Sequence, residues 1–299
     1  MTPQRIPIRL GHSPDPDDVF MWWPLFEFNG KPAVISSPRF SFEPVLIDIE
    51  SANRRAEAGE DLLEITALSC GQYPRVADVY AITACGSSMG EGYGPKLVAR
   101  SEITVEELRE GSKRVAIPGA RTTANLALSL LLGPGQFEPV EVPFKDVPEC
   151  VRSGEADAGV VIHEGQLTYE QDGLVLVKDL GAWWGEKTDL PLPLGVNAIR
   201  RDLEELHGPG TLAEIADLLE RSVEHALANV DEAISHAQEH AGDIEQSLTR
   251  EFVDMYVNRL TVDVGPVGLT AVDRLLREAA EAGLVPPVDE VVPIRSLSD

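Results

Sequence analysis

Short apolar segments of strand length alternate with amphipathic helical segments over the first two thirds of the chain. At first the pattern predicts strands at 6–12, 40–50, 62–69, 78–85 and 95–101 and helices at 17–27 and 51–60. It continues with strands at 113–119, 140–146, 157–164 and 173–181 and helices at 104–111, 122–132 and 146–155. Alternation of this kind is typical of an α/β fold, and we expect mostly parallel strand pairing.

The pattern changes after about residue 200, where apolar positions recur at helical spacing. Helices are predicted at 211–242, 246–260 and 267–283. The natural arrangement is a larger discontinuous lobe, made of residues 1–100 and 196–299, with residues 101–195 inserted as a smaller lobe. The chain would cross between the lobes near 99–101 and 193–195, and we expect a ligand in the cleft between them.

Composition and charge narrow the class of protein. The 299 residues are 43% hydrophobic, with no apolar run of membrane-spanning length and no N-terminal export signal. The three cysteines are odd in number and lack metal-ligand spacing, so we expect reduced thiols in a cytoplasmic protein. The net charge of −25 argues against nucleic acid as a partner, because two polyanions repel each other, but local donors can still bind a small anion.

One histidine stands at the end of an apolar strand. Residues 159–169 read GVVIHEGQLTY, so His163 and Glu164 follow the strand directly, where α/β proteins place ligand-binding residues. Since imidazole titrates near neutral pH, His163 is a candidate general base or acid, with Glu164 orienting the ring or capping the next helix. The alternative is a structural histidine bonded to a nearby carbonyl group.

A second candidate site lies at the start of the predicted helix 122–132. A strand and a Pro-Gly turn precede it, followed by Arg121, Thr122 and Thr123. A helix start offers free N–H groups and positive dipole charge, so these residues are candidates to hold a carboxylate or phosphate. An ordinary capped helix would show the same pattern.

The segment SPDPDD, residues 13–18, also connects a predicted strand to a predicted helix, and Ser13 is a candidate donor to a ligand. Its three aspartates suggest a divalent cation, but the segment lacks the glycine of a calcium loop and its prolines make it a rigid turn, so we expect no metal. The chain has no dinucleotide-binding, phosphate-loop or serine-hydrolase motif. A reaction without a cofactor, or simple binding, is therefore favoured.

Taken together, these segments resemble the 1,4-dihydroxy-6-naphthoate synthases of the futalosine route to menaquinone. The resemblance spans nearly the whole chain and is densest in VIHEGQLTYEQDGLVLVKDLGAWWGEKTDLPLPLG, residues 161–195, with YVNRLTVDVG, residues 256–265, as a second segment. This family is related to chorismate dehydratases and to type II periplasmic binding proteins. The resemblance implies an α/β, two-lobed fold like that of type II periplasmic binding proteins, with an interlobe cleft and C-terminal helices.

The resemblance also implies a reaction and a set of residues. The substrate would be cyclic dehypoxanthine futalosine, a small molecule that carries a carboxylate, and a histidine base would start a retro-aldol-type carbon–carbon cleavage without a cofactor. His163 matches that base, and Thr122 and Thr123 match the substrate-binding helix start of the family. The matches to the second binding segment of the family are Thr66, Leu68 and Ser69.

The sequence departs from the usual family pattern at several of these positions. The first family motif usually reads Ser-Pro-Cys-Pro-Asn-Asp-Thr, whereas residues 13–19 read SPDPDDV. Ala67 stands where the family usually carries lysine, and Gln166 stands where some members carry arginine. The cleft thus gains carboxylates and loses cations, which weakens its hold on a substrate carboxylate unless Arg121 compensates. These departures suggest a divergent branch with a related but altered substrate.

Two alternatives compete with the synthase. One is a non-catalytic binding protein of the same fold, which is usually exported, so that the missing signal sequence counts against it. The other is an enzyme of the same superfamily with a different substrate, such as a chorismate dehydratase, which the His-Glu and GAWW segments match less well.

Overall fold

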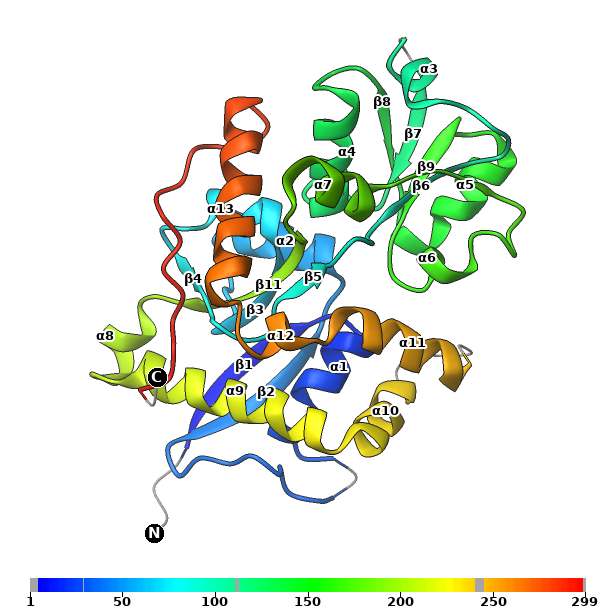
Figure 1. The fold of residues 1–299 in the computed structure, drawn as a ribbon. Helices are drawn as coiled ribbons and strands as arrows, with labels where there is room; N and C mark the ends of the chain where they lie inside the picture. The colour runs from blue at the N-terminus through cyan, green and yellow to red at the C-terminus, as the bar shows by residue number, and fades with distance from the viewer. Residues whose placement is uncertain (1–4, 29, 111–112, 240–244, 298–299) are drawn as a thin grey trace.

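The computed structural model describes residues 5–28, 30–110, 113–239 and 245–297, and its strands form two separate sheets (Figure 1). The six-stranded sheet contains β1 (Ile6–His12), β2 (Phe40–Leu46), β3 (Ile65–Ser69), β4 (Tyr80–Ile82), β5 (Ser88–Gly90) and β11 (Leu192–Arg200). The five-stranded sheet contains β6 (Lys96–Ala99), β7 (Arg114–Ile117), β8 (Glu138–Glu141), β9 (Ala158–Val161) and β10 (Val175–Asp179). Each sheet, with its helices, forms one lobe of a two-lobed α/β molecule.

Both sheets are mixed, so the expectation of mostly parallel pairing is wrong. In the larger lobe the order is β2-β1-β3-β11-β4, with β5 also beside β11, and in the smaller lobe it is β10-β6-β9-β7-β8. The strands β1 and β7 pair in parallel with both of their neighbours, whereas β11 and β6 pair antiparallel with all of theirs. The antiparallel strands are the ones by which the chain enters the smaller lobe and leaves it.

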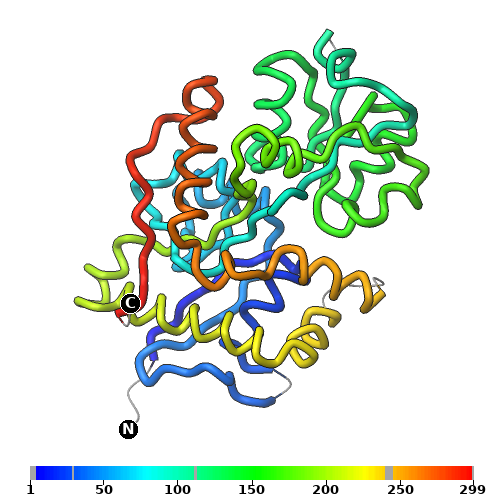
Figure 2. The backbone as a smooth tube through the Cα atoms, viewed as in Figure 1, coloured from blue at the N-terminus to red at the C-terminus, as the bar shows by residue number. Residues whose placement is uncertain are grey.

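The chain crosses between the lobes twice, as the tube in Figure 2 shows. It leaves the larger lobe after β5, and β6 already pairs in the other sheet although it precedes the predicted boundary at residue 100. It returns between α7 (Leu180–Thr188) and β11, whose first residue, Leu192, pairs with Gly90 of β5. The two crossings lie close together, because the N–H group of Leu180 donates to the carbonyl oxygen of Pro95 at 2.9 Å.

The larger lobe is covered by helices from both ends of the chain. They are α1 (Pro16–Trp22), α2 (Ile49–Ala58), α8 (Leu203–His207), α9 (Thr211–Ala228), α10 (Val230–Gln238), α11 (Gln246–Tyr256), α12 (Arg259–Val262) and α13 (Gly265–Glu281). The apolar stripe of α9, with Ile215 and Leu219, packs against Phe20 and Trp22 of α1 in one buried core. The predicted helix 211–242 is broken near Asn229, and its residues 240–242 lie outside the described part of the chain.

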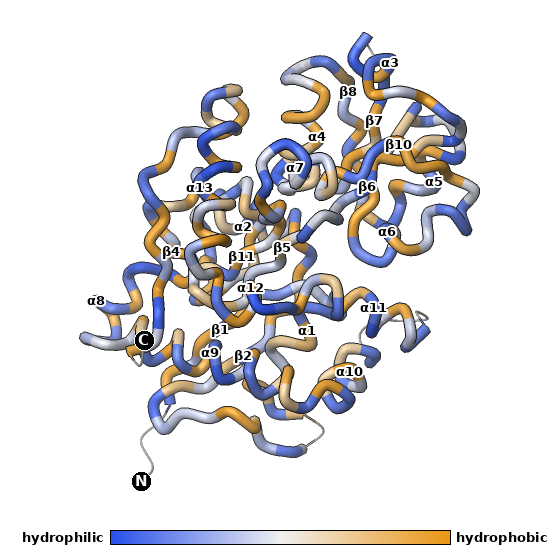
Figure 3. Tube along the Cα trace, viewed as in Figure 1, coloured by the Kyte–Doolittle hydropathy of each residue, from blue (hydrophilic) through white to orange (hydrophobic). Residues whose placement is uncertain are grey.

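The smaller lobe carries α3 (Val105–Arg109), α4 (Thr123–Leu132), α5 (Val147–Ser153), α6 (Gly165–Thr168) and α7 around its sheet. The predicted helix 104–111 extends further than α3 at its C-terminal end. Its last residue, 111, lies outside the described residues. Helix α4 is apolar along most of its length (Figure 3), and its buried Ala127 and Leu128 belong to a core that also includes Leu68 and Val196 of the larger lobe. No helix within the described ranges is long and apolar enough to cross a membrane.

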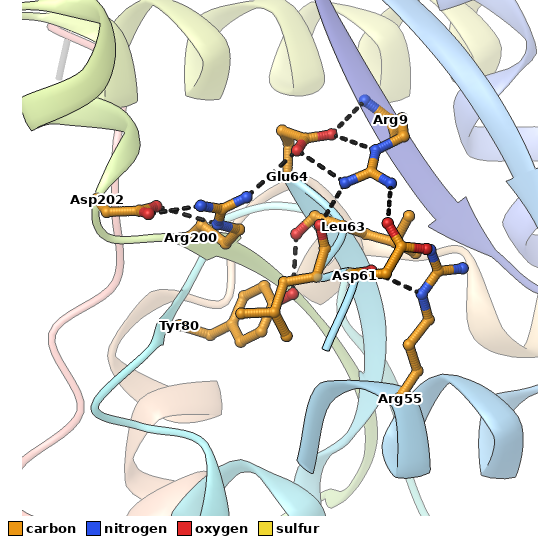
Figure 4. Close-up of polar contacts among 9 residues, drawn as sticks. Arg9, Arg55, Asp61, Leu63, Glu64, Tyr80, Arg200 and Asp202 are labelled. Atoms are coloured by element: carbon orange, nitrogen blue, oxygen red, sulfur yellow. Dashed lines mark hydrogen bonds and ion pairs between the residues drawn. The ribbon is translucent and has the colours of Figure 1, made fainter. Parts of the chain in front are cut away.

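A polar network ties the central strands of the larger lobe at one end (Figure 4). Glu64, just before β3, accepts hydrogen bonds from Arg9 of β1 at 2.9 Å and from Arg200 of β11 at 3.3 Å. Burial alone would raise the pKa of Glu64, but the hydrogen bonds from Arg9 hold it below its usual value. This anchor fixes the three strands relative to one another, and the opposite end of β3, at Ser69, faces the site described next.

Candidate functional site

A cavity that is partly open to solvent lies between the two lobes. The larger lobe contributes residues that follow β1, the end of β3, the middle of β11 and one face of α11. The smaller lobe contributes the start of α4 and the residues after β9. The strand ends of both sheets thus meet at one place, which is where α/β proteins bind ligands.

The cavity brings together six of the nine residues predicted from the sequence. Its lining includes Ser13, Leu68, Ser69, Thr122, Thr123 and His163. The other three, Thr66, Arg121 and Glu164, are not among the lining residues. Thr66 is buried and its hydroxyl group donates to the carbonyl oxygen of Ala67, while Glu164 immediately precedes α6.

His163 reaches the cavity from the loop after β9. Its backbone has φ of 52°, a left-handed conformation that is uncommon for residues other than glycine, although histidine, like asparagine and aspartate, adopts it more often than most. Its Nδ1 lies 3.1 Å from Oδ2 of Asp15, which belongs to the other lobe. The ring also packs edge-on against Phe144, with 4.4 Å between ring centroids. The side chain is therefore held on two sides while it remains on the cavity wall.

The turn SPDPDD forms an acidic part of the cavity wall. Asp15, Asp17 and Asp18 all line the cavity, whereas no lysine or arginine is among the described residues that line it. Burial and the nearby charge of Asp15 raise the pKa of Asp17 to about 6, although His163 and the hydroxyl group of Ser88, which donates at 3.2 Å, act in the opposite direction. Burial and the charge of Asp17 likewise raise the pKa of Asp18 well above its ordinary value.

The start of α4 forms another part of the wall. The side chain of Thr122 caps the helix by accepting a hydrogen bond from the N–H group of Asn125 at 3.2 Å. The hydroxyl group of Thr123 accepts from the N–H group of Gly71 at 3.1 Å and donates to the carbonyl oxygen of Leu194 at 2.6 Å. Both groups belong to the larger lobe, so Thr123 also joins the lobes. The positive end of the helix dipole points at the cavity from here.

Arg121 is directed toward α2, away from the cavity lining. Its guanidinium group binds the carboxylate of Glu57 and lies 3.9 Å from that of Glu50, and its N–H group donates to Glu50 at 3.0 Å. The hydrogen bond from Arg121 lowers the pKa of Glu57. The physical reason for this placement is the pair of acidic residues on α2, which compete for the cation. The carboxylate-binding role of Arg121 stays a prediction.

The cavity also contains polar residues that were not among the nine predicted site residues. Asn197, in the middle of β11, is buried, and its amide nitrogen donates to the carbonyl oxygen of Gly86 while its Oδ1 has no partner within the described residues. The hydroxyl group of Tyr256 and the side-chain amide of Gln166 lie 2.7 Å apart and connect α11 to α6 across the lobes. A lone asparagine or tyrosine in a strand or helix carries no sequence signal of its own, so only the fold reveals these residues.

The set of donors does not resemble a metal centre. Within the part of the chain that the structure describes, no group of three or more histidine, cysteine, aspartate or glutamate side chains is placed to hold a metal ion. The three cysteines, Cys70, Cys85 and Cys150, are buried free thiols away from the cavity lining. What the wall offers is one imidazole, three carboxyl groups, several hydroxyl groups and a helix start.

Residues 8–281 match the family model described as menaquinone biosynthesis. The chain belongs to the menaquinone biosynthesis family. It is 41% identical over 280 residues to a 1,4-dihydroxy-6-naphthoate synthase of Thermus thermophilus, covering 94% of this chain and 96% of that one. It is 33% identical to a synthase of the same name from Streptomyces coelicolor, covering 93% and 95% of the two chains.

Solved structures support the fold. A crystal structure of an Archaeoglobus fulgidus protein superimposes with a TM-score of 0.79 at 38% identity, covering 93% of this chain and 98% of that one. An alkanesulfonate-binding protein of Xanthomonas axonopodis superimposes with a TM-score of 0.69 at 12% identity, covering 98% and 99%. The second similarity shows the fold alone. This chain therefore has the architecture of periplasmic binding proteins.

Proposed function

We propose that this chain is a 1,4-dihydroxy-6-naphthoate synthase that cleaves a carbon–carbon bond of cyclic dehypoxanthine futalosine, or of a close relative of it, in the cytoplasm and without a cofactor. One observation carries the proposal: a chain 41% identical to such a synthase places His163 in an interlobe cavity that is also lined by hydroxyl groups, carboxyl groups and a helix start. That combination supplies a base and an anion site in one cavity.

In the proposed reaction, His163 removes the proton of a sugar hydroxyl group. The electrons of the O–H bond form a carbonyl group, the adjacent carbon–carbon bond breaks, and its electrons pass to the ring portion as an enolate that becomes the naphthoate. The proton of the hydroxyl group stays on the imidazole until it is returned to the product or to water. No oxidant or reductant is consumed.

The cavity wall has two ends of different polarity, and this difference would orient the substrate. The start of α4, with Thr122 and Thr123, offers N–H groups and positive dipole charge to the substrate carboxylate. The acidic turn and the unpartnered Oδ1 of Asn197 attract hydrogen-bond donors, which suits the hydroxyl groups of a sugar. The carboxylate would therefore lie at α4 and the sugar near His163.

The test is to mix the purified protein with cyclic dehypoxanthine futalosine and to follow 1,4-dihydroxy-6-naphthoate by chromatography. Replacing a general base typically lowers the rate by about 10²- to 10⁴-fold, so His163→Ala is expected to lose turnover to that extent and to keep its thermal stability. His207→Ala is the matched control, because His207 lies in α8, away from the cavity, and should turn over normally. Full activity of His163→Ala would remove His163 from the mechanism.

A wild-type protein that is folded but forms no product would point to an altered substrate. The acidic wall and Ala67 would be the cause, because two carboxyl groups replace neutral residues of the usual family motif and Ala67 replaces a lysine. Thermal-shift measurements with neutral and carboxylate-bearing analogues would then identify the class of ligand, since a ligand that binds only the folded state raises Tm.

A further inference from the structure

The contact between Asp15 and His163 joins two largely buried side chains whose positions are fixed by the protein. The two side chains are only 10% and 15% exposed, and a carboxylate in such a place is costly unless it is paired. Asp15 Oδ2 accepts a hydrogen bond from the hydroxyl group of Ser13 and is also the atom that lies 3.1 Å from Nδ1 of His163. One oxygen therefore has both of its partners fixed within the site.

The backbone around Asp15 is rigid for reasons that are visible in the sequence. Asp15 stands between Pro14 and Pro16, and the residue before a proline is confined to extended conformations. Its observed φ of −66° and ψ of 150° agree with this restriction. Its N–H group donates to the hydroxyl oxygen of Ser13 at 2.8 Å, so the turn closes on itself. The carboxylate is thus held in place before any ligand binds.

The carboxylate of Asp15 serves neither of the common structural roles. Asp15 precedes the first turn of α1, yet its side chain makes no capping hydrogen bond. No lysine or arginine lies within ion-pair distance of it in the described part of the chain. On the imidazole, Nδ1 has this carboxylate, whereas Nε2 makes no hydrogen bond or ion pair with any described residue. The ring therefore has one nitrogen held by the protein and one left for a substrate.

We propose that Asp15 is a positioning residue that keeps the neutral imidazole of His163 protonated at Nδ1 and leaves Nε2 as the proton acceptor. This inference rests on the proposed function only for the identity of the proton that Nε2 removes. Because Asp15 belongs to the larger lobe and His163 to the smaller one, the pair exists only when the lobes are together. Closure of the cleft would then orient the base as well as exclude water.

The deciding experiment is a long-range ¹H–¹⁵N spectrum of the histidine rings, recorded on the full chain at a pH where titration shows the rings to be neutral. The signals of His163 are assigned by their absence in His163→Gln. The wild type is expected to carry the Nδ1–H tautomer at His163, and Asp15→Ala is expected to shift that ring to the Nε2–H tautomer. Asp17→Ala is the matched control, because it removes a carboxyl group from the same turn without touching Nδ1.

Kinetics give a second readout. In Asp15→Ala the value of kcat is expected to fall about 10- to 100-fold, since the base is misoriented. An Nε2–H tautomer in the wild type, an unchanged tautomer in Asp15→Ala, or the same tautomer shift in Asp17→Ala would overturn the proposal. The tautomer is measured without turnover, so it tests the role of Asp15 even if the synthase reaction is not observed.

Discussion

The ionisation of Asp17 should register in the stability of the fold. Its pKa is about 6 in the folded chain and near 3.8 in an unfolded one, so between these values the folded state holds a proton that the unfolded state has lost. The contribution of Asp17 to stability is therefore greatest below about pH 4 and is lost as the pH rises through about 6. Carboxyl groups stabilised by ion pairs have the opposite dependence.

The variant Asp17→Asn removes the loss of stability that ionisation of Asp17 causes. It keeps an acceptor for the hydroxyl group of Ser88. We expect it to be more stable than the wild type by about 1–3 kcal/mol at pH 7.5, because one pKa unit corresponds to about 1.4 kcal/mol and the cavity wall is partly open to solvent. At about pH 5 the difference should be much smaller. Urea unfolding of both proteins at the two pH values measures it, and a difference that is independent of pH would contradict the assignment.

For individual residues, the sequence pattern predicted part of the site but missed the contact between Asp15 and His163. His163 follows an apolar strand, and Thr122 and Thr123 open a helix, so local patterns sufficed to place them in the cavity. Arg121 has an equally clear pattern but pairs with Glu57, because α2 lies beside it. The contact of Asp15 with His163 joins residues on different lobes, and no local pattern reports how two lobes meet.

Among the elements, α7 shows how one glycine sets the distance between the two chain crossings. A β-carbon on Gly181 would overlap the backbone carbonyl group of Tyr93, whereas one on Gly185 would meet nothing closer than 3.9 Å. The two glycines lie in the same helix, so they form a matched pair for mutation. The first permits the close packing of the crossings and the second does not take part in it.

We expect Gly181→Ala to lower the free energy of unfolding by about 1–3 kcal/mol, since backbone atoms on both sides must move. Gly185→Ala should raise it slightly, by up to about 1 kcal/mol, because alanine favours a helix interior over glycine. Guanidinium unfolding of the two variants and the wild type gives the comparison. Equal effects of the two substitutions would show that the contact with Tyr93 does not constrain the crossing.

The elements that the sequence pattern predicted best are those with uninterrupted local signals. The strand at 6–12 and the helical character of the C-terminal third are confirmed. The strand β11 carries Pro193 and Gly195, which weaken a strand pattern, and its pairing with β5 is irregular at those residues. Because β11 was not predicted as a strand, its antiparallel pairing with three neighbours could not be predicted either.

For the molecule as a whole, the net charge of −25 is the dominant property. Self-repulsion of this size destabilises the compact state, and salt reduces it because the Debye length falls from about 10 Å at 0.1 M to about 3 Å at 1 M. We expect Tm to rise by several degrees between about 0.05 M and 1 M KCl. Differential scanning calorimetry measures the shift, with an uncharged osmolyte at equal osmolality as the control. A Tm that falls with salt would mean that attractive ion pairs outweigh the repulsion.

The pairing of β5 with β11 has a consequence for the order in which the chain folds. It places Gly90 beside Leu192, across roughly 100 residues of intervening chain. Closing an unstructured loop of that length costs about 4 kcal/mol of chain entropy, from 1.5RT ln n. The cost is much smaller once the intervening lobe has folded, because β6 and β10 pair Lys96 with Asp179 and hold the two ends of that lobe together. The smaller lobe therefore has an entropic reason to fold first, with β11 completing the sheet of the larger lobe last.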